Sequence, residues 1–160
     1  MKLTSEKLKI VNDFLDQEEA PVRVITLAHT LGLKVYRAPW PSDVSGKIQK
    51  DPARGGKSGY AIFVNQDHHE NRRRFTIAHE IAHYVLHERK IGDGVFDDAL
   101  YRSGLSDRAE VEANKLAADI LMPRRLLRKY QLLFDDDAEV LAREFKVSEQ
   151  AMKIRLGQYV

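Results

Sequence analysis

Residues 71–87 read NRRRFTIAHEIAHYVLH, and this stretch decides the fold. Its apolar residues recur three and four positions apart, and further apolar side chains fill the other side of the helical wheel. A helix that is apolar around so much of its circumference lies buried in the middle of a domain. We therefore predict a central helix over residues 71–87, with the other elements packed around it.

The pentapeptide HEIAH within this helix has the spacing of a metal site. His79 and His83 are four positions apart, which puts their Cβ atoms about 6 Å from each other on one helix face. Two such imidazoles can bind the same zinc ion, while Glu80, about 100° around the helix, points toward water at the metal. The sequence contains no cysteine, so a metal must be held by His and carboxylate side chains. The alternative is a pair of buried histidines with hydrogen bonds satisfied inside the core.

A helix predicted at about 107–121 supplies a third ligand. Glu110 shares a face with Ala113 and Ala117, whose small side chains allow a close approach to the central helix. The two histidines and Glu110 form a ligand set that leaves a fourth position for water, as in catalytic zinc sites. In the alternative interpretation, Glu110 is a buried carboxylate paired with one of the arginines at 72–74.

Neighbouring polar residues are expected to play other roles. Glu112 falls on the opposite side of the second helix, and Asn114 is expected to hydrogen-bond an imidazole of the site. His87 lies about 12 Å of helical rise beyond the first histidine of the motif, so it is predicted to be structural or to support a ligand. The longer metzincin signature is excluded, because Leu86 and Arg89 occupy the positions where it requires Gly and His.

The rest of the sequence predicts an α+β domain in which helices dominate and three strands form a small antiparallel sheet. The predicted elements are helices at 4–17 and 21–31, strands at 33–39, 45–50 and 59–65, loops at 51–59 and 91–107, and a helix that begins at Pro123. We predict that residues 1–132 form the main domain.

The remaining segment, 133–160, has the layout of a helix-turn-helix, with Ser148 as N-cap of its second helix. Residues 136–160 contain five acidic and four basic residues, whereas a DNA-binding module is plainly positive. Direct nucleic-acid binding is therefore not expected. We predict an appendage that packs on the main domain or docks a protein substrate.

Charge and hydropathy narrow the functional class of the whole chain. The 160 residues include 26 basic and 24 acidic side chains, a net charge of +2, so any basic binding site must be local. The N-terminal residues lack the apolar core of a signal peptide, and no stretch approaches 18 apolar residues. We expect a cytoplasmic protein with no membrane partner. The oligomeric state stays open.

Several motifs stand together around the pentapeptide. RRRFTIAHE overlaps HEIAH, and EVEANKLAADILMP follows it; together they resemble the ImmA/IrrE family of bacterial zinc metallopeptidases. The likeness continues through PVRVITLAHTLGLKVY, DVSGKI, GYAIFVN and LAREFKVSEQAMKIRLGQ, which together span nearly the whole chain. The resemblance implies a zincin-like domain, with His79, His83 and Glu110 as the zinc ligands and Glu80 as general base. Asn114 stands where the related glutamate-zincin pattern has Asp, which implies a less basic ligand.

The resemblance also implies a reaction and a partner. Family members commonly cut a helix-turn-helix repressor, which relieves repression of a mobile element or a stress regulon. We therefore expect a zinc-dependent endopeptidase with such a repressor as its substrate; the same ligands also accept Mn²⁺. One alternative is a zinc-containing regulatory module that binds a repressor or DNA without hydrolysis. Another is a DNA-binding protein that acts through its tail.

Two further roles follow from the expected reaction. A donor must stabilise the tetrahedral oxyanion, and Tyr101, Arg102 and Arg155 are the candidates, although surface or packing roles are favoured for all three. An exposed strand edge would align an extended substrate through main-chain hydrogen bonds. Gly59 to Val64 is the expected edge.

Overall fold

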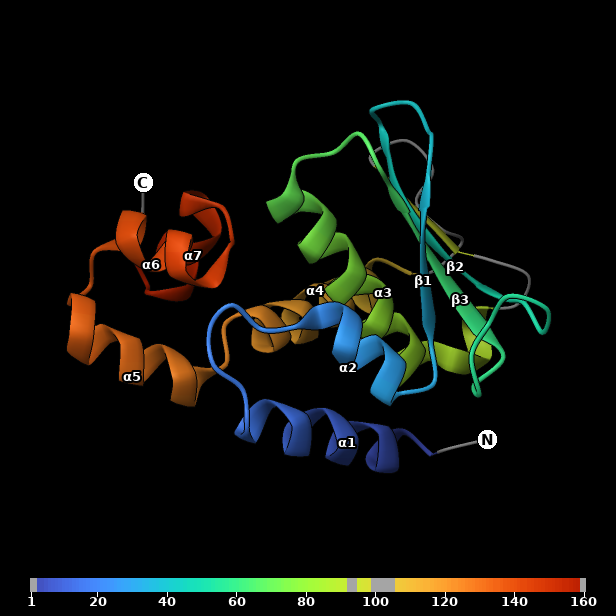
Figure 1. Ribbon diagram of the computed structural model, residues 1–160, viewed down its shortest axis with the longest axis horizontal. Coiled ribbons are helices and arrows are strands. Elements are labelled where there is room, and N and C mark those ends of the chain that lie inside the picture. Colours follow the sequence, from blue (N-terminus) through green and yellow to red (C-terminus); the bar gives the residue numbers. More distant parts are fainter. Residues whose placement is uncertain (1–2, 92–94, 99–105, 159–160) are drawn as a thin grey trace.

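The computed structural model describes residues 3–91, 95–98 and 106–158. It confirms an α+β fold dominated by helices (Figure 1). The helices are α1 (Thr4–Asp16), α2 (Val24–Thr30), α3 (Glu70–Ile91), α4 (Asp107–Leu121), α5 (Arg124–Phe134), α6 (Ala138–Phe145) and α7 (Glu149–Arg155). The strands are β1 (Lys34–Ala38), β2 (Val44–Lys50), β3 (Tyr60–Asn65) and β4 (Val95–Asp98). Within the described residues, no helix combines the length and the apolar content needed to cross a membrane.

The central helix is α3, which lies across one face of the sheet with α4 along one side and α2 along the other (Figure 1). All side chains from Thr76 to Val85 are buried, as the apolar pattern predicts. The helix continues beyond the predicted end to Ile91, and it departs from helical geometry at His87, where φ is −130° and ψ is 27°. The sheet and the flanking helices thus enclose the part of α3 that carries HEIAH.

The sheet is mixed, and the expectation of an antiparallel sheet is correct only in part. The strand order is β1-β3-β2-β4; β2 runs antiparallel to β3 and β4, whereas β1 runs parallel to β3. All residues of β3 are buried, so this strand occupies the interior of the sheet between β1 and β2. Because β1 and β2 run in opposite directions, a strand inserted between them must be parallel to one of them.

Strand β4 lies inside the stretch predicted to be a loop. Residues 91–107 show no sustained periodicity, and β4 is instead defined by its backbone pairing with β2, in which Ile48 is opposite Val95. The pairing needs a partner that is distant in sequence, so a local pattern does not reveal it. The flanking residues 92–94 and 99–105 lie outside the described part of the chain.

The C-terminal segment forms the two short helices α6 and α7, as predicted. Ser148 Oγ accepts a hydrogen bond of 3.0 Å from Ala151 N, so it is the N-cap of α7. Leu141 and Phe145 of α6 are fully buried, and Asn71 Nδ2 of α3 donates to the carbonyl of residue 147. The helix pair therefore contacts the N-terminal end of α3, while its treatment as a separate appendage stays a prediction.

Candidate metal centre

Three side chains from two helices converge at the predicted metal site. His79 and His83 lie one turn apart on α3, and Glu110 lies in the first turn of α4. Glu110 Oε2 is 3.2 Å from His79 Nε2, and Glu110 Oε1 is 3.1 Å from His83 Nε2. The three candidate ligand atoms lie within 4.8 Å of one another, and both imidazoles are buried. Residues 31 positions apart in sequence thus form one cluster of nitrogen and oxygen donors.

The spacing of these donors fits a single divalent ion. In a tetrahedral zinc site with bonds of about 2.0–2.1 Å, neighbouring ligand atoms are about 3.3 Å apart. Each histidine Nε2 is at a distance close to this value from one of the two Glu110 oxygens, His79 from Oε2 and His83 from Oε1. The rings of His79 and His83 are perpendicular, at 88°, with centroids 4.5 Å apart, so they approach each other edge to face. Two imidazoles and one carboxylate are also the ligand set of catalytic zinc sites.

Helix α4 brings Glu110 to the histidines because its contact face is made of alanines. Ala113 and Ala117 are fully buried, and their small side chains let α4 pack closely along α3. Ser106 Oγ accepts a hydrogen bond of 3.2 Å from Ala109 N and caps the helix start. This cap starts α4 so that Glu110 falls in its first turn.

Glu80 is fully buried and its carboxylate lies against β2. A Cβ atom at Gly46 of β2 would lie 3.4 Å from Glu80 Oε2 and would overlap Thr76 Cγ2. β2 therefore approaches α3 at this point only because residue 46 has no side chain. The close approach holds the Glu80 carboxylate between β2 and the turn that carries His79.

We expect Gly46→Ala to lower stability and to disturb Glu80. The new methyl group overlaps Thr76, so α3 or β2 must shift, at a cost of about 1–3 kcal/mol in the free energy of unfolding. Thr76→Ser removes the overlapping methyl and keeps the hydroxyl that donates to Arg72 O at 3.0 Å. Urea unfolding should therefore show partial recovery of stability in the Gly46→Ala, Thr76→Ser double variant. Equal stability of Gly46→Ala and the wild type would contradict the contact.

A chain of hydrogen bonds leads away from the candidate metal ligands. His83 Nδ1 is 3.1 Å from His87 Nδ1, and His87 Nε2 is 3.1 Å from Glu112 Oε1. Burial lowers the pKa of His87, and the hydrogen bond from His87 lowers the pKa of Glu112. A neutral His87 that donates through Nε2 to the carboxylate must accept through Nδ1 from His83 Nδ1–H. That tautomer of His83 leaves its Nε2 free of a proton and able to bind a metal.

These contacts correct two expectations about α4. Glu112 was expected on the side away from the site but reaches His87, whereas Asn114 is exposed and makes no hydrogen bond with an imidazole among the described residues. At 100° per residue, Glu110 and Glu112 lie about 60° and 100° to opposite sides of Ala113. Because the alanine stripe lets the helices approach closely, both flanking carboxylates reach α3. Close packing thus extends the reach of α4 to two histidines on α3.

The geometry agrees with the comparison to known families. A model of the IrrE N-terminal-like domain, from the peptidase M78 family, matches residues 23–157. The chain belongs to this family. Membership in M78 confirms the ImmA/IrrE resemblance and supports a metallopeptidase-type function. Together with the cluster on α3 and α4, it also indicates a metal cofactor.

The fold of this M78 domain also occurs in a solved structure, a Mycobacterium tuberculosis transcriptional regulator. The TM-score is 0.61 at 16% sequence identity, and the match covers 95% of this chain and 46% of that chain. The M78 chain thus spans less than half the length of that protein. No curated protein matches the chain.

Of the three candidate oxyanion donors, the structure of this M78 protein describes Arg155. Arg155 Nη2 is 2.8 Å from Asp119 Oδ1, and Asp119 follows Glu110 by about 13.5 Å along α4. Arg155 therefore has the packing role that the sequence favoured for it. The guanidinium of Arg155 fixes α7 to the end of α4. Tyr101 and Arg102 lie outside the described residues.

The arginines at 72–74 do not pair with Glu110, so that alternative is wrong. Arg72 Nη2 donates to Ser45 Oγ at 3.1 Å, and Arg73 Nη1 donates to His68 O at 2.8 Å. Arg74 points to a different face of α3, toward α2 and β1. Glu110 instead contacts His79 and His83.

The expected substrate edge at Gly59 to Val64 is also wrong. Residues 60–64 of this stretch belong to β3, which pairs on both sides and has no free edge. The outer strands of the described sheet are β1 and β4, and Asp97 of β4 is in register with Gly46, the residue next to Glu80. The sheet edge associated with the candidate site is therefore β4.

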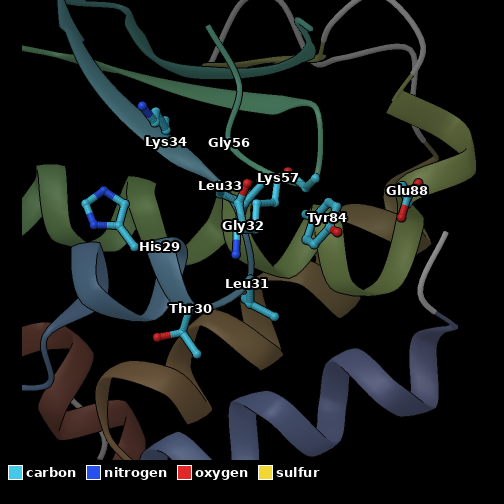
Figure 2. Close-up of a pocket in the computed structure, with 11 residues that line it drawn as sticks. His29, Thr30, Leu31, Gly32, Leu33, Lys34, Gly56, Lys57, Tyr84 and Glu88 are labelled. Carbon is cyan, nitrogen blue, oxygen red and sulfur yellow. Dashed lines mark hydrogen bonds between the residues drawn. The ribbon is translucent and has the colours of Figure 1, made fainter.

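A cavity of about 590 Å³ lies away from this cluster, between the turn before β1, residues 56–58 and the last turns of α3 (Figure 2). Tyr84 and Glu88 of α3 line it, and none of the candidate metal ligands does. The buried amino group of Lys7 forms an ion pair with Glu88 and donates to Tyr84 O at 3.1 Å. Burial and the Glu88 carboxylate raise the pKa of Tyr84 to about 12. Glu88 and the Tyr84 carbonyl thus help to hold α1 against α3.

Proposed function

We propose that this M78 domain is a zinc-dependent endopeptidase that cleaves a specific protein substrate. The observation that carries the proposal is the convergence of His79, His83 and Glu110, with the buried Glu80 carboxylate in the same turn of α3. A purely structural metal site has no need of an additional buried acid beside its ligands. A hydrolytic site needs one.

The proposed roles follow from the positions of these residues. His79, His83 and Glu110 would hold the ion through the three converging atoms. When bound, the ion supplies a Lewis acid that polarises the scissile carbonyl and makes water easier to deprotonate. Zinc is proposed because a His₂Glu set with an open position suits it, and Mn²⁺ also accepts these ligands.

Glu80 is proposed to move the proton. Its carboxylate takes a proton from the attacking water and delivers it to the nitrogen of the leaving amine, so one residue serves as base and then as acid. The close approach of β2 at Gly46 limits the space around the Glu80 carboxylate. The residue that stabilises the oxyanion is not assigned among the described side chains.

The substrate is proposed to lie as an extended segment beside β4. β4 is the outer strand of the described sheet on the side of β2, and strands in a sheet are about 4.8 Å apart. A segment that adds to this edge would form main-chain hydrogen bonds along it, two strand spacings or about 9.6 Å from β2, the strand that lies against Glu80. A helix-turn-helix repressor is proposed as the protein that presents this segment, and both proteins would meet in the cytoplasm.

The decisive experiment is cleavage of a helix-turn-helix repressor, chosen from the genes that neighbour the gene of this protein. The purified full chain is mixed with the repressor in the presence of Zn²⁺, and fragments are identified by mass spectrometry. We expect one defined cut that disappears with a chelator and returns when Zn²⁺ is restored. An intact repressor under all conditions, with metal shown to be bound, would contradict this substrate.

We expect the His83–His87–Glu112 chain to strengthen metal binding by orienting His83. Loss of a residue that supports a metal ligand typically weakens affinity 10–100-fold, so His87→Ala and Glu112→Gln should lie in this range. Affinity is measured by competition with a chromophoric chelator. Arg108→Gln is the matched control, because Arg108 approaches Glu112 at 4.0 Å but does not touch His87. The same affinity in Glu112→Gln and the wild type would contradict the role.

A further inference from the structure

Arginines gather around a second cavity, on the other side of α3 from the metal cluster. The cavity has a volume of about 380 Å³ and lies between α2, β1 and the first turns of α3. Figure 1 shows α2 and β1 beside this end of α3. Four arginines line it: Arg23, Arg37, Arg73 and Arg74. Buried Val64 and Ile77 also line it, so the cavity combines an apolar wall with basic groups.

The charge of this arginine cavity is only partly neutralised by nearby acids. Glu70 is the one carboxylate among its lining residues, and its Oε1 lies 3.1 Å from Lys146 Nζ. Glu18 lies outside the lining and pairs with Arg23, whose Nε donates to it at 3.2 Å. With Arg23 paired to Glu18 and Glu70 paired to Lys146, the other three arginines concentrate positive charge here, on a chain whose net charge is only +2.

Arg74 is the member of the group with two enclosed donors that have no acceptor in the described part of the chain. Its Nε and Nη2 atoms are enclosed, and no described residue accepts a hydrogen bond from either. Burial lowers the pKa of Arg74, and the charge of Glu70 opposes this shift. Enclosed donors of a charged group are rarely left without acceptors, because the lost hydration is not replaced. Oxygens of a bound anion would replace it after a small rotation of the guanidinium.

The arginine cavity is separate from the proposed peptidase site. Around α3, His79 and His83 lie about 140° and 180° from Arg74, so the two sites use opposite faces of one helix. None of the candidate metal ligands lines the cavity. A ligand here would therefore contact α2, β1 and α3 without contacting the metal.

We propose that the arginine cavity binds a phosphoryl group, either as free phosphate or on a small organic molecule. The planar guanidinium donates two parallel hydrogen bonds to a phosphate, which makes arginine the suited residue for this recognition. Arg74 and the exposed Arg37 would provide the main contacts. The volume is within the range of small-molecule sites, and Val64 and Ile77 offer contact to an apolar or aromatic part of the ligand.

The test is calorimetric titration of the full chain, freed of metal by a chelator, with inorganic phosphate, pyrophosphate and AMP at constant ionic strength. We expect saturable one-to-one binding and a rise in the unfolding temperature. Tighter binding of AMP than of phosphate supports an organic ligand, and equal binding supports free phosphate. Absence of saturable binding of all three at millimolar concentrations overturns the proposal.

Variants locate the binding in the arginine cavity. Arg74→Gln should weaken binding at least about tenfold, since it removes charged hydrogen bonds. Arg74→Lys keeps the charge but loses the planar guanidinium, so it should also weaken binding. It provides the test if Arg74→Gln does not fold. Arg72→Gln is the matched control, because Arg72 lies on another face of α3 and donates to Ser45. Unchanged affinity in both Arg74 variants, or an equal loss in Arg72→Gln, overturns the assignment.

Discussion

Replacing Glu80 with Gln should lower the rate of repressor cleavage about 10²–10⁴-fold while metal affinity stays the same. The amide has nearly the shape of the carboxylate but cannot accept the proton of the attacking water, and general base catalysis is worth about this factor. Single-turnover cleavage at saturating enzyme isolates this step from substrate binding. Metal content, measured on the same samples, separates loss of chemistry from loss of the ion.

Glu6→Gln is the matched control for this prediction, since it makes the same change of charge at an exposed position of α1. Cleavage by Glu80→Gln at the wild-type rate would contradict its assignment as base. The variant also separates the two functional classes, because a non-hydrolytic regulatory module would still relieve repression in stoichiometric amounts when Glu80 is Gln. An enzyme would not.

Glu110→Ala should reduce metal affinity more than about 100-fold and abolish cleavage with it. Loss of a residue that only supports a ligand already costs 10–100-fold, and Glu110 contributes one of the three converging ligand atoms. Metal binding stabilises the folded state in proportion to the logarithm of the ligand excess, so Zn²⁺ should raise the unfolding temperature of the wild type. That rise should be much smaller in Glu110→Ala.

Asn114→Ala serves as the control on the same helix, one turn further along. Its side chain is exposed, so metal affinity should stay unchanged. Wild-type affinity in Glu110→Ala would show that another group completes the ligand set. A loss in Asn114→Ala as large as that in Glu110→Ala would indicate general damage to α4 rather than removal of a ligand.

The sequence was sufficient to predict features that depend on residues close together in the chain. The apolar period over residues 71–87 predicted a buried helix, and the side chains from Thr76 to Val85 are buried. The spacing of two histidines by four residues predicted one shared face, because the helical repeat places such residues together. The position of Glu110 beside Ala113 and Ala117 indicated the third donor for the same reason. These predictions depend on the geometry of single helices.

Contacts between segments that are far apart in the chain could not be predicted from the geometry of single helices. The parallel pairing of β1 with β3 and the existence of β4 depend on partners far away in the chain. The reach of Glu112 to His87 depends on how closely α3 and α4 approach. The gathering of arginines around a cavity depends on α2, β1 and α3 meeting at one place.

One physical cause separates the features that the sequence predicted from those that only the tertiary structure shows. Which face of a helix a residue occupies is determined by bond geometry within a few residues. The order of amino acids alone was therefore enough to predict the candidate metal ligands and the buried helix. Which other group that face meets is determined by strand pairing and by the distance between packed elements, so only the folded chain decided the sheet direction, the support of His83 and the arginine cavity.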